Sequence, residues 1–241
     1  QQEKENLRRK PVFILQSTCP PVDSNIMELL LLIDAARRAS ASEITAVIPY
    51  LGYQRQNHLF RVGEAISLEV IVTTLESVGI DRVVTMDLHS VRIEEAFTLP
   101  ISHLSALPVF KQVILDHGWN TPHTVLVSPD KGGARRIEML ADDLGSSNIA
   151  IVGKNRDLET GAVTAMTIEG DLGERAIIVD DMISSGATVI KAAELLKEKG
   201  VEEVIVFATH GILASGASKS LQVSVIDKVF ITDTVLVPEI F

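Results

Sequence analysis

The sequence predicts an α/β fold made of two similar, doubly wound domains with mostly parallel sheets. Short β-branched runs that are apolar throughout, as expected of strands covered on both faces, alternate with segments of helical period. The order strand, loop, helix, strand also occurs twice, over residues 12–52 and again over residues 176–211. We therefore expect two related halves that divide near residues 103–108, with domains at 1–104 and 105–241.

The elements follow from local patterns along the chain. Strands are predicted to begin at residues 12, 44, 82, 124, 149, 176, 204 and 229. Helices are predicted over 24–39, 64–78, 131–144 and 187–199. Ser24 or Asn25 is a possible N-cap of the first helix, and Gly200 ends the last one, where glycine is common.

Composition limits the possible classes of function. The chain has 241 residues, 46% of them hydrophobic, which is enough for a sizeable core, and a net charge of −10 that attracts neither nucleic acid nor anionic membranes. Its single cysteine, Cys19, excludes an intrachain disulfide. The apolar run at 26–33 is far shorter than the roughly 20 residues of a membrane span, and the charged N-terminus lacks a signal peptide core. We expect a cytoplasmic protein without nucleic-acid or membrane partners.

The most informative loop follows the strand predicted at residue 176. Two adjacent carboxylates, Asp180 and Asp181, precede small residues and then a helix whose unpaired amides and positive dipole end suit a phosphate. The carboxylates would repel that phosphate, so they suit sugar hydroxyls or a divalent metal. The simpler alternative is that Asp180 only caps the helix.

Two further strand ends carry acid and imidazole groups. His89 follows an acidic strand end, and Asp130 precedes two glycines at the start of a helix. Together they could hold Mg²⁺, which takes one or two protein ligands and keeps several waters. A purely structural histidine is the alternative interpretation of His89.

Basic and amide groups follow two other strands. Lys154 and Arg156 are either a mobile clamp on transition-state charge or a solvated surface pair. Arg55 could stack on a base while Gln56 and Asn57 contact its polar edges, although that pattern alone is weak. Neither GxxxxGK[ST] nor GxGxxG occurs, so Walker and Rossmann sites are unsupported.

With these residues assembled, the chain resembles the ribose-phosphate pyrophosphokinases, also called phosphoribosyl pyrophosphate synthetases. "VDDMISSGAT" alone would indicate only the phosphoribosyl pyrophosphate loop that type I phosphoribosyltransferases share. "IPYLGYQRQ" with "MDLH" at the expected spacing is much more specific to the synthetases, and "SPDKGG" and "FATHGILASGA" extend the resemblance along the chain. The resemblance implies two domains of the type I phosphoribosyltransferase kind, the first on the ATP side and the second on the ribose 5-phosphate side.

The resemblance also implies an activity and a role for each candidate residue. The family transfers the diphosphoryl group of ATP to the 1-hydroxyl of ribose 5-phosphate, with Mg²⁺, and releases AMP. The ATP contacts would be Arg55, Gln56, Asn57 and His89, the metal-associated pair His89 and Asp130, and the catalytic cations Lys154 and Arg156. The ribose 5-phosphate contacts would be Asp180, Asp181, Ser184, Ser185, Gly186, Ala187 and Thr188. A homo-oligomer, a hexamer built from dimers, is the expected assembly.

The chain departs from the family pattern in a few places. Asn57 stands where the family has an aspartate, and Gly63 where an arginine is common. The family's segment before residue 1 and its helix after residue 241 have no counterpart, so we expect either a natural short form or a fragment with impaired activity. The missing first segment favours one alternative, a catalytically weak synthetase paralogue that regulates an active partner. A second alternative, a type I phosphoribosyltransferase, would explain the loop after Asp181 but not "MDLH" or the two halves.

Overall fold

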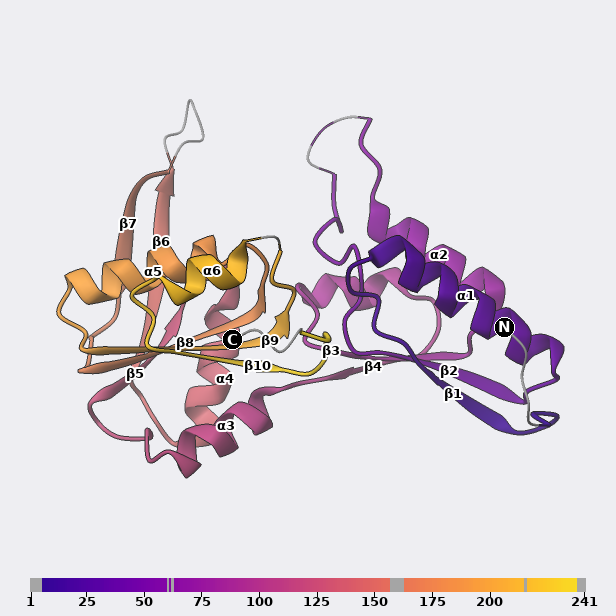
Figure 1. Cartoon of the computed structure of the whole chain (residues 1–241), viewed down its shortest axis with the longest axis horizontal. Helices are drawn as coiled ribbons and strands as arrows, with labels where there is room; N and C mark the ends of the chain where they lie inside the picture. Colours follow the sequence, from indigo (N-terminus) through magenta and orange to yellow (C-terminus); the bar gives the residue numbers. More distant parts are fainter. Residues whose placement is uncertain (1–5, 60, 62, 157–162, 215, 238–241) are drawn as a thin grey trace. The chain divides into compact units, whose positions relative to one another are not determined.

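The structure, a computed structural model, describes residues 6–59, 61, 63–156, 163–214 and 216–237. The chain divides into two compact units, each with its own sheet, which we name unit 1 (Gln1–Ser105) and unit 2 (Ala106–Phe241) (Figure 1). The boundary predicted from the sequence lies one residue earlier. In the part of the chain that the structure describes, no helix has the length and apolar character needed to span a membrane.

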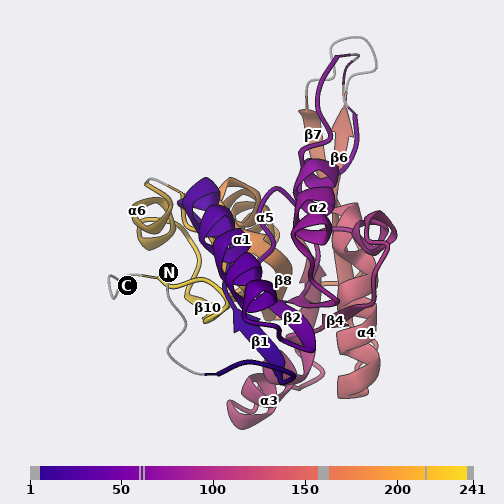
Figure 2. The same cartoon turned by 90° about the vertical axis from the view of Figure 1, so that its right-hand side faces the viewer.

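Unit 1 contains a four-stranded parallel sheet. In sheet order its strands are β1 (Pro11–Leu15), β2 (Glu43–Ile48), β3 (Arg82–Met86) and β4 (Ile101–Leu104). Helices α1 (Val22–Arg38) and α2 (Ser67–Val78) contact each other and lie side by side over one face of this sheet (Figures 1 and 2). A 3₁₀ helix, η1 (Val91–Ala96), follows β3.

The core of unit 1 lies between these helices and the sheet. Leu29 and Ile33 of α1 are fully buried with Ile44 and Ile48 of β2, because apolar residues at i and i+4 of a helix share one face. On the other face, Phe13 and Leu15 of β1 are each 70% exposed. The expectation of strands covered on both faces is therefore wrong for β1.

Unit 2 contains a six-stranded sheet in which only the β6–β7 pair is antiparallel. In sheet order its strands are β10 (Lys228–Thr232), β9 (Glu203–Gly211), β8 (Arg175–Ile183), β5 (Thr124–Ser128), β6 (Ile149–Arg156) and β7 (Val163–Glu169). The connecting helices are α3 (Leu107–Asp116), the short 3₁₀ helix η2 (Lys131–Gly133), α4 (Ala134–Leu144), α5 (Ala187–Glu198) and α6 (Ala217–Gln222). Figure 1 shows α5 and α6 on one face of the sheet and α3 and α4 on the other.

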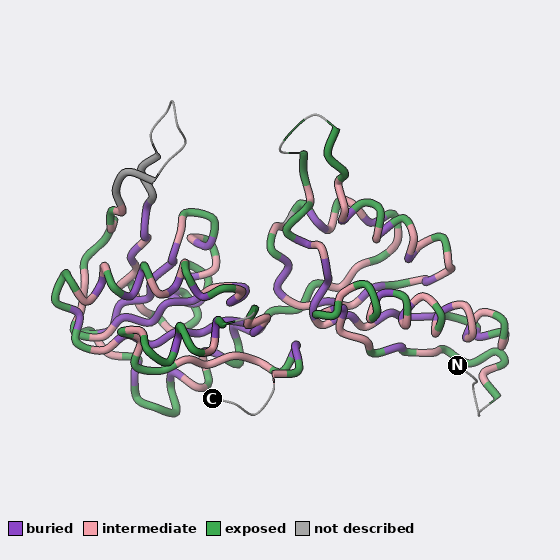
Figure 3. The backbone as a smooth tube through the Cα atoms, turned by 45° about the horizontal axis from the view of Figure 1, so that its top comes forward, coloured by how far each residue is buried: buried purple, intermediate pink, exposed green. Residues whose placement is uncertain are grey.

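This sheet is covered on both faces and forms the larger core. The burial of β8 and β9 is nearly continuous, and these strands run through the purple centre of unit 2 in Figure 3. At its edge, Trp119 stacks on His117 with ring centroids 4.2 Å apart and meets Phe230 edge to face. Phe230 stacks in turn on Phe207 of β9. Continuous apolar runs are typical of parallel strands between two layers of helices.

The predicted elements are present, with shifted ends and with omissions. All eight predicted strands and all four predicted helices occur, which confirms an α/β fold with mostly parallel sheets. The predicted cap of the first helix is wrong, because α1 begins at Val22 after Pro21. Strands β4 and β7 and helices α3 and α6 were not predicted.

Candidate active site

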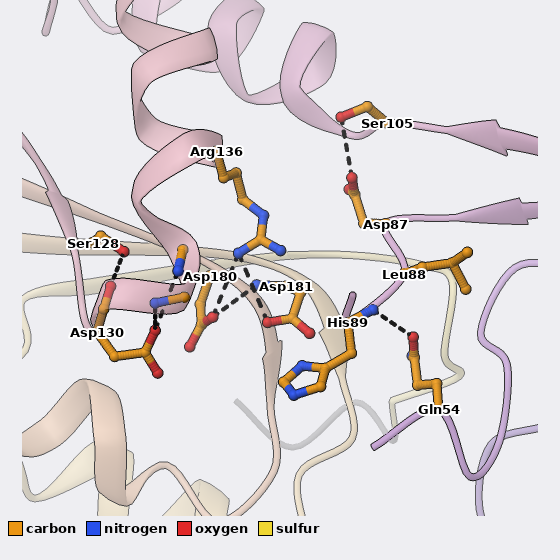
Figure 4. A network of polar contacts seen from close by, with 12 residues as sticks. Gln54, Asp87, Leu88, His89, Ser105, Ser128, Asp130, Arg136, Asp180 and Asp181 are labelled. Carbon is orange, nitrogen blue, oxygen red and sulfur yellow. Dashed lines mark hydrogen bonds and ion pairs between the residues drawn. The ribbon is translucent and has the colours of Figure 1, made fainter. Parts of the chain in front are cut away.

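Two carboxylates and one guanidinium group form a largely buried charged cluster in unit 2. Asp180 and Asp181 lie within β8, which continues to Ile183, so the prediction that they end the strand is wrong. Nη1 of Arg136, from the first turn of α4, lies 3.7 Å from Oδ1 of Asp180 and 3.8 Å from Oδ1 of Asp181 (Figure 4). The side chain of Arg136 is 16% exposed, that of Asp180 18% and that of Asp181 7%. One cation therefore serves two adjacent acids away from bulk water.

The cluster changes the acidity of one of these groups. Burial raises the pKa of Asp180 well above its usual value of 3.8, and the charge of Asp181 raises it further, whereas Arg136 acts in the opposite direction. The Asp181 amide donates a 2.9 Å hydrogen bond to Oδ1 of Asp180. The two adjacent acids thus repel each other more than Arg136 compensates, and donors such as sugar hydroxyls would relieve that repulsion.

The loop after β8 has the geometry of an anion site. Gly186 adopts φ = 80° and serves as the N-cap residue of α5, with no side chain capping the helix. A left-handed conformation at this position favours glycine. Within the described residues, the amide of Ala187 has only a long 3.4 Å bond to Oγ of Ser185, so the first turn of α5 still offers donors to an anion. Because the N-cap is Gly186, the alternative that Asp180 caps this helix is wrong.

Asp130 is held by the start of the next helix. Its Oδ1 accepts hydrogen bonds from the amides of Gly132 at 2.9 Å and Gly133 at 3.2 Å. Among the described residues, Oδ2 has no hydrogen bond, which leaves one oxygen for a ligand. A Cβ atom on Gly133 would lie 2.6 Å from Oγ of Ser128, so the turn requires glycine there. Ser128 donates to the Asp130 carbonyl at 2.6 Å.

The predicted ATP-binding residues of unit 1 lie in a turn after β2. Arg55 and Gln56 are exposed, and Asn57 is half-buried with its Oδ1 2.8 Å from Nδ1 of His58. The turn is closed by the Gln56 amide, which donates to the Tyr53 carbonyl at 2.8 Å. Tyr53 has φ = 62° and donates its hydroxyl to Asp23, a hydrogen bond that raises the pKa of Tyr53.

His89 belongs to the loop after β3 in the same unit. Its side chain is exposed, so His89 is not a core residue. Its amide donates a 2.8 Å hydrogen bond to Oε1 of Gln54, so the loop of His89 and the turn of Arg55 are joined directly (Figure 4). The structure therefore places the loop of His89 beside the turn that carries Arg55, Gln56 and Asn57.

The predicted catalytic cations occupy the end of β6. The strand includes both positions, with Lys154 opposite Met166 and Arg156 opposite Val163 in the antiparallel pair. The sequence predicts these cations in a loop just past the strand. That prediction is wrong, because the backbone of both residues belongs to β6. Their side chains, and residues 157–162, lie outside what the structure describes.

The fit of Mg²⁺ depends on the chemistry of the two predicted ligands. Asp130 offers the carboxylate oxygen that this hard cation prefers, whereas His89 offers a nitrogen, which suits it less well. The two residues belong to different units, and among the described residues no group of three or more His, Cys, Asp and Glu side chains could hold a metal. The fit therefore rests on Asp130, and the pairing with His89 stays a prediction.

Two residues that were not predicted lie beside the candidate groups. Arg136 lies six positions after Asp130, and only the packing of α4 on β8 brings it to the aspartates. Gln54 stands in the polar run "YQRQN", which suggests a surface residue, yet its side chain is fully buried. No pattern in the sequence distinguishes Gln54 from its exposed neighbours.

The chain matches two family descriptions. Residues 1–79 match the N-terminal domain of ribose phosphate pyrophosphokinase, and residues 158–239 match the phosphoribosyl synthetase-associated domain. A ribose-phosphate pyrophosphokinase of Shewanella oneidensis is 45% identical over 241 residues, which are 99% of this chain and 76% of the relative. That of Vibrio cholerae is 44% identical over 236 residues, 97% of this chain and 74% of the relative.

A solved structure supports the same assignment. The crystal structure of phosphoribosylpyrophosphate synthetase from Mycobacterium smegmatis superimposes with a TM-score of 0.90 at 36% identity, covering 98% of this chain and 76% of that one. The similarity therefore extends over nearly the whole chain, in fold as well as in sequence. The chain belongs to the ribose-phosphate pyrophosphokinase family.

Proposed function

We propose that the protein transfers the diphosphoryl group of ATP to the 1-hydroxyl of ribose 5-phosphate, giving phosphoribosyl pyrophosphate and AMP. The observation that carries this proposal is the buried pair Asp180 and Asp181 directly before the open N-terminus of α5, in a chain of this family. A sugar phosphate has hydroxyls for the acids and an anion for the helix.

In this proposal unit 2 binds ribose 5-phosphate. Asp180 and Asp181 accept hydrogen bonds from the ribose hydroxyls, and the segment from Ser184 to Thr188 surrounds the 5-phosphate with backbone amides. The charged cluster supports the assignment of the hydroxyls to the acids, because two largely buried acids that repel each other are stabilised by hydroxyl donors. The sugar is then held at both ends, which restricts its rotation and orients the 1-hydroxyl.

Unit 1 binds ATP in this proposal. Arg55 stacks on or pairs with the nucleotide, Gln56 and Asn57 contact polar edges, and His89 donates to the polyphosphate. The exposure of Arg55, Gln56 and His89 supports these roles, because a group that contacts a ligand must be reachable. The bond between Gln54 and His89 supports a shared role for the two loops.

The reaction breaks one phosphoanhydride bond and forms one phosphate ester bond. The ribose 1-hydroxyl oxygen attacks the β-phosphorus of ATP, the bond from that phosphorus to the oxygen of the α-phosphate breaks, and the hydroxyl proton passes to solvent. Lys154 and Arg156 stabilise the charge that develops on the transferring group. Asp130 would hold Mg²⁺ through its carboxylate, and the bound ion would neutralise part of the polyphosphate charge. Since both substrates are anionic, positioning and neutralisation provide most of the rate enhancement.

The cellular setting belongs to the same proposal. We infer a cytoplasmic enzyme that assembles with copies of itself as a hexamer built from dimers and that uses Mg²⁺. The net charge of −10 supports the absence of nucleic-acid and anionic membrane partners. The alternative of a regulatory paralogue has no support among the relatives, which are named for the enzyme.

A coupled assay for AMP tests the proposed function. The purified protein is expected to release AMP from ATP only when ribose 5-phosphate and Mg²⁺ are both present. Lys154→Ala and Arg156→Ala are each expected to lower kcat by about 100-fold, the usual loss for one group that stabilises transition-state charge. Arg135→Ala, an exposed cation of α4, is the control and keeps wild-type turnover. AMP release at the same rate with and without ribose 5-phosphate would contradict the proposal.

A further inference from the structure

Three consecutive backbone amides hold the loop that follows β3. The Asp87 amide donates to the Leu104 carbonyl at 3.0 Å, and the Leu88 amide donates to Nε2 of His103 at 2.9 Å. The His89 amide donates to Oε1 of Gln54 at 2.8 Å. The first two acceptors are neighbours in β4, and the third belongs to the turn after β2.

The middle acceptor has a defined tautomer. Because Nε2 of His103 accepts from the Leu88 amide, the ring hydrogen lies on Nδ1, which donates to Oε1 of Glu94 at 2.7 Å. The loop itself is strained at Asp87, which is buried, has φ = 33° and accepts a 3.1 Å bond from Ser105. A conformation that a non-glycine residue rarely adopts persists only when its surroundings fix it.

Gln54, unlike the other two acceptors, joins the loop of His89 to the turn that carries Arg55. It precedes Arg55 directly, so its side chain connects the turn of the proposed ATP-binding residues to the backbone of His89. Its side chain is fully buried, and its Nε2 has no hydrogen-bond partner among the described residues. A buried amide with an unpaired donor lowers stability, so stability alone does not account for a glutamine here.

We propose that Gln54 is a positioning residue of the ATP site, which fixes the backbone of His89 relative to Arg55 through its side-chain oxygen. This inference rests on the proposed function, since it assigns the linked loops to ATP. Gln54 does not touch the nucleotide. Its effect is to hold two exposed side chains in one arrangement, and rigid placement of contacting groups lowers the cost of reaching the reactive geometry.

The first test measures the hydrogen bond without any substrate. In Gln54→Met the side chain keeps a similar length but loses its acceptor, so amide hydrogen exchange over residues 86–92 is expected to accelerate at least tenfold relative to wild type. Thr45→Val is the matched control, because it removes a buried polar atom from β2 of the same unit. The control should exchange at the wild-type rate over 86–92.

The second test measures both Michaelis constants in the AMP assay. Gln54→Met is expected to raise KM for ATP about tenfold and to leave KM for ribose 5-phosphate within twofold, because the misplaced groups contact only ATP. Its thermal midpoint should match or exceed that of the wild type, since a buried unpaired donor is removed. Thr45→Val should keep both constants.

The outcomes separate this proposal from the proposed function. Unchanged exchange in Gln54→Met overturns the positioning role, and so does faster exchange with an unchanged KM for ATP. Equal rises in both Michaelis constants would indicate a general structural defect and also overturn it. If the wild type makes no AMP, the proposed function fails by itself, and ATP affinity from calorimetry then replaces KM as the second measurement.

Discussion

The two units hold their candidate groups by opposite means. In unit 1, neutral acceptors bind backbone amides, and the side chains of Arg55 and His89 stay exposed. In unit 2, the candidate carboxylates themselves are largely buried, and both lie beside the guanidinium group of Arg136. The first arrangement fixes positions at little electrostatic cost, whereas the second retains repulsion between Asp180 and Asp181 until a ligand relieves it.

This difference leads to a general expectation about substitutions. A change in the charged cluster of unit 2 should alter stability and ligand affinity in opposite directions, because the same repulsion that destabilises the empty site favours the ligand. A change at an exposed contact group of unit 1 should alter function and leave stability nearly constant. Substitutions in each unit can therefore contradict the comparison or refine it.

The largest effect is expected for Asp180→Asn. Loss of a charged acceptor costs about 1.5–3 kcal/mol, so kcat/KM for ribose 5-phosphate should fall roughly 10- to 150-fold. At neutral pH the free energy of unfolding should rise, because the repulsion with Asp181 is removed. Kinetic assays and urea denaturation measure the two effects. Asp142→Asn, at an exposed acid of α4, is the control, and a variant that loses both affinity and stability would contradict the comparison.

The pH dependence of the same variant follows from the raised pKa of Asp180. Between the usual aspartate value of about 3.9 and the raised value, the folded state binds more protons than the unfolded state, so wild-type stability falls as pH rises through this window. Asp180→Asn cannot lose a proton. Its advantage in urea denaturation should therefore be absent below about pH 4 and should grow towards neutral pH.

The second largest effect is expected for Arg136→Met, and it is an effect on stability. Removing the guanidinium leaves both acids without this cation, so unfolding free energy should fall by about 2 kcal/mol at neutral pH, less than for most buried ion pairs because Asp180 can take up a proton. Arg136→Lys should recover part of this loss. In a double-mutant cycle, Asp180→Asn should reduce the effect of Arg136→Met, and strictly additive energies would argue against the coupling.

The smallest change in stability is expected for His89→Ala. Its side chain is exposed, so the thermal midpoint should shift by less than about 2 °C, while kcat falls about tenfold through loss of a polyphosphate contact. His123→Ala, at an exposed histidine of unit 2, is the control. A drop in the midpoint comparable to that of Arg136→Met would show that unit 1 also depends on its functional side chain for stability.

Much of the fold could be predicted from sequence because the central strands are continuous apolar runs. The omitted strands lack that signal. Ile101–Leu104 is only four residues long and contains Ser102 and His103, while Val163–Glu169 alternates with polar residues and forms the antiparallel edge of its sheet. A strand that is very short, or whose polar residues follow no strict period, resembles a loop in a single sequence.

The sequence suggests candidate site residues where polar groups are concentrated in consecutive positions. Asp180, Asp181 and the loop to Thr188 stand together in the chain, so their pattern by itself indicates a phosphorylated sugar. Arg136 and Gln54 act through residues about 45 and 35 positions away, respectively, and that proximity comes only from packing. Spacing along the chain cannot reveal such partners.

Because Trp119 lies in unit 2, its fluorescence allows the unfolding of the two units to be measured separately. It is the only tryptophan of the chain and lies in the aromatic cluster of unit 2, 4.2 Å from the ring of His117. Its fluorescence therefore reports the unfolding of unit 2 alone, while circular dichroism reports both units. Two transitions that fail to coincide would show that the halves melt independently, and each variant could then be assigned to the half that it weakens.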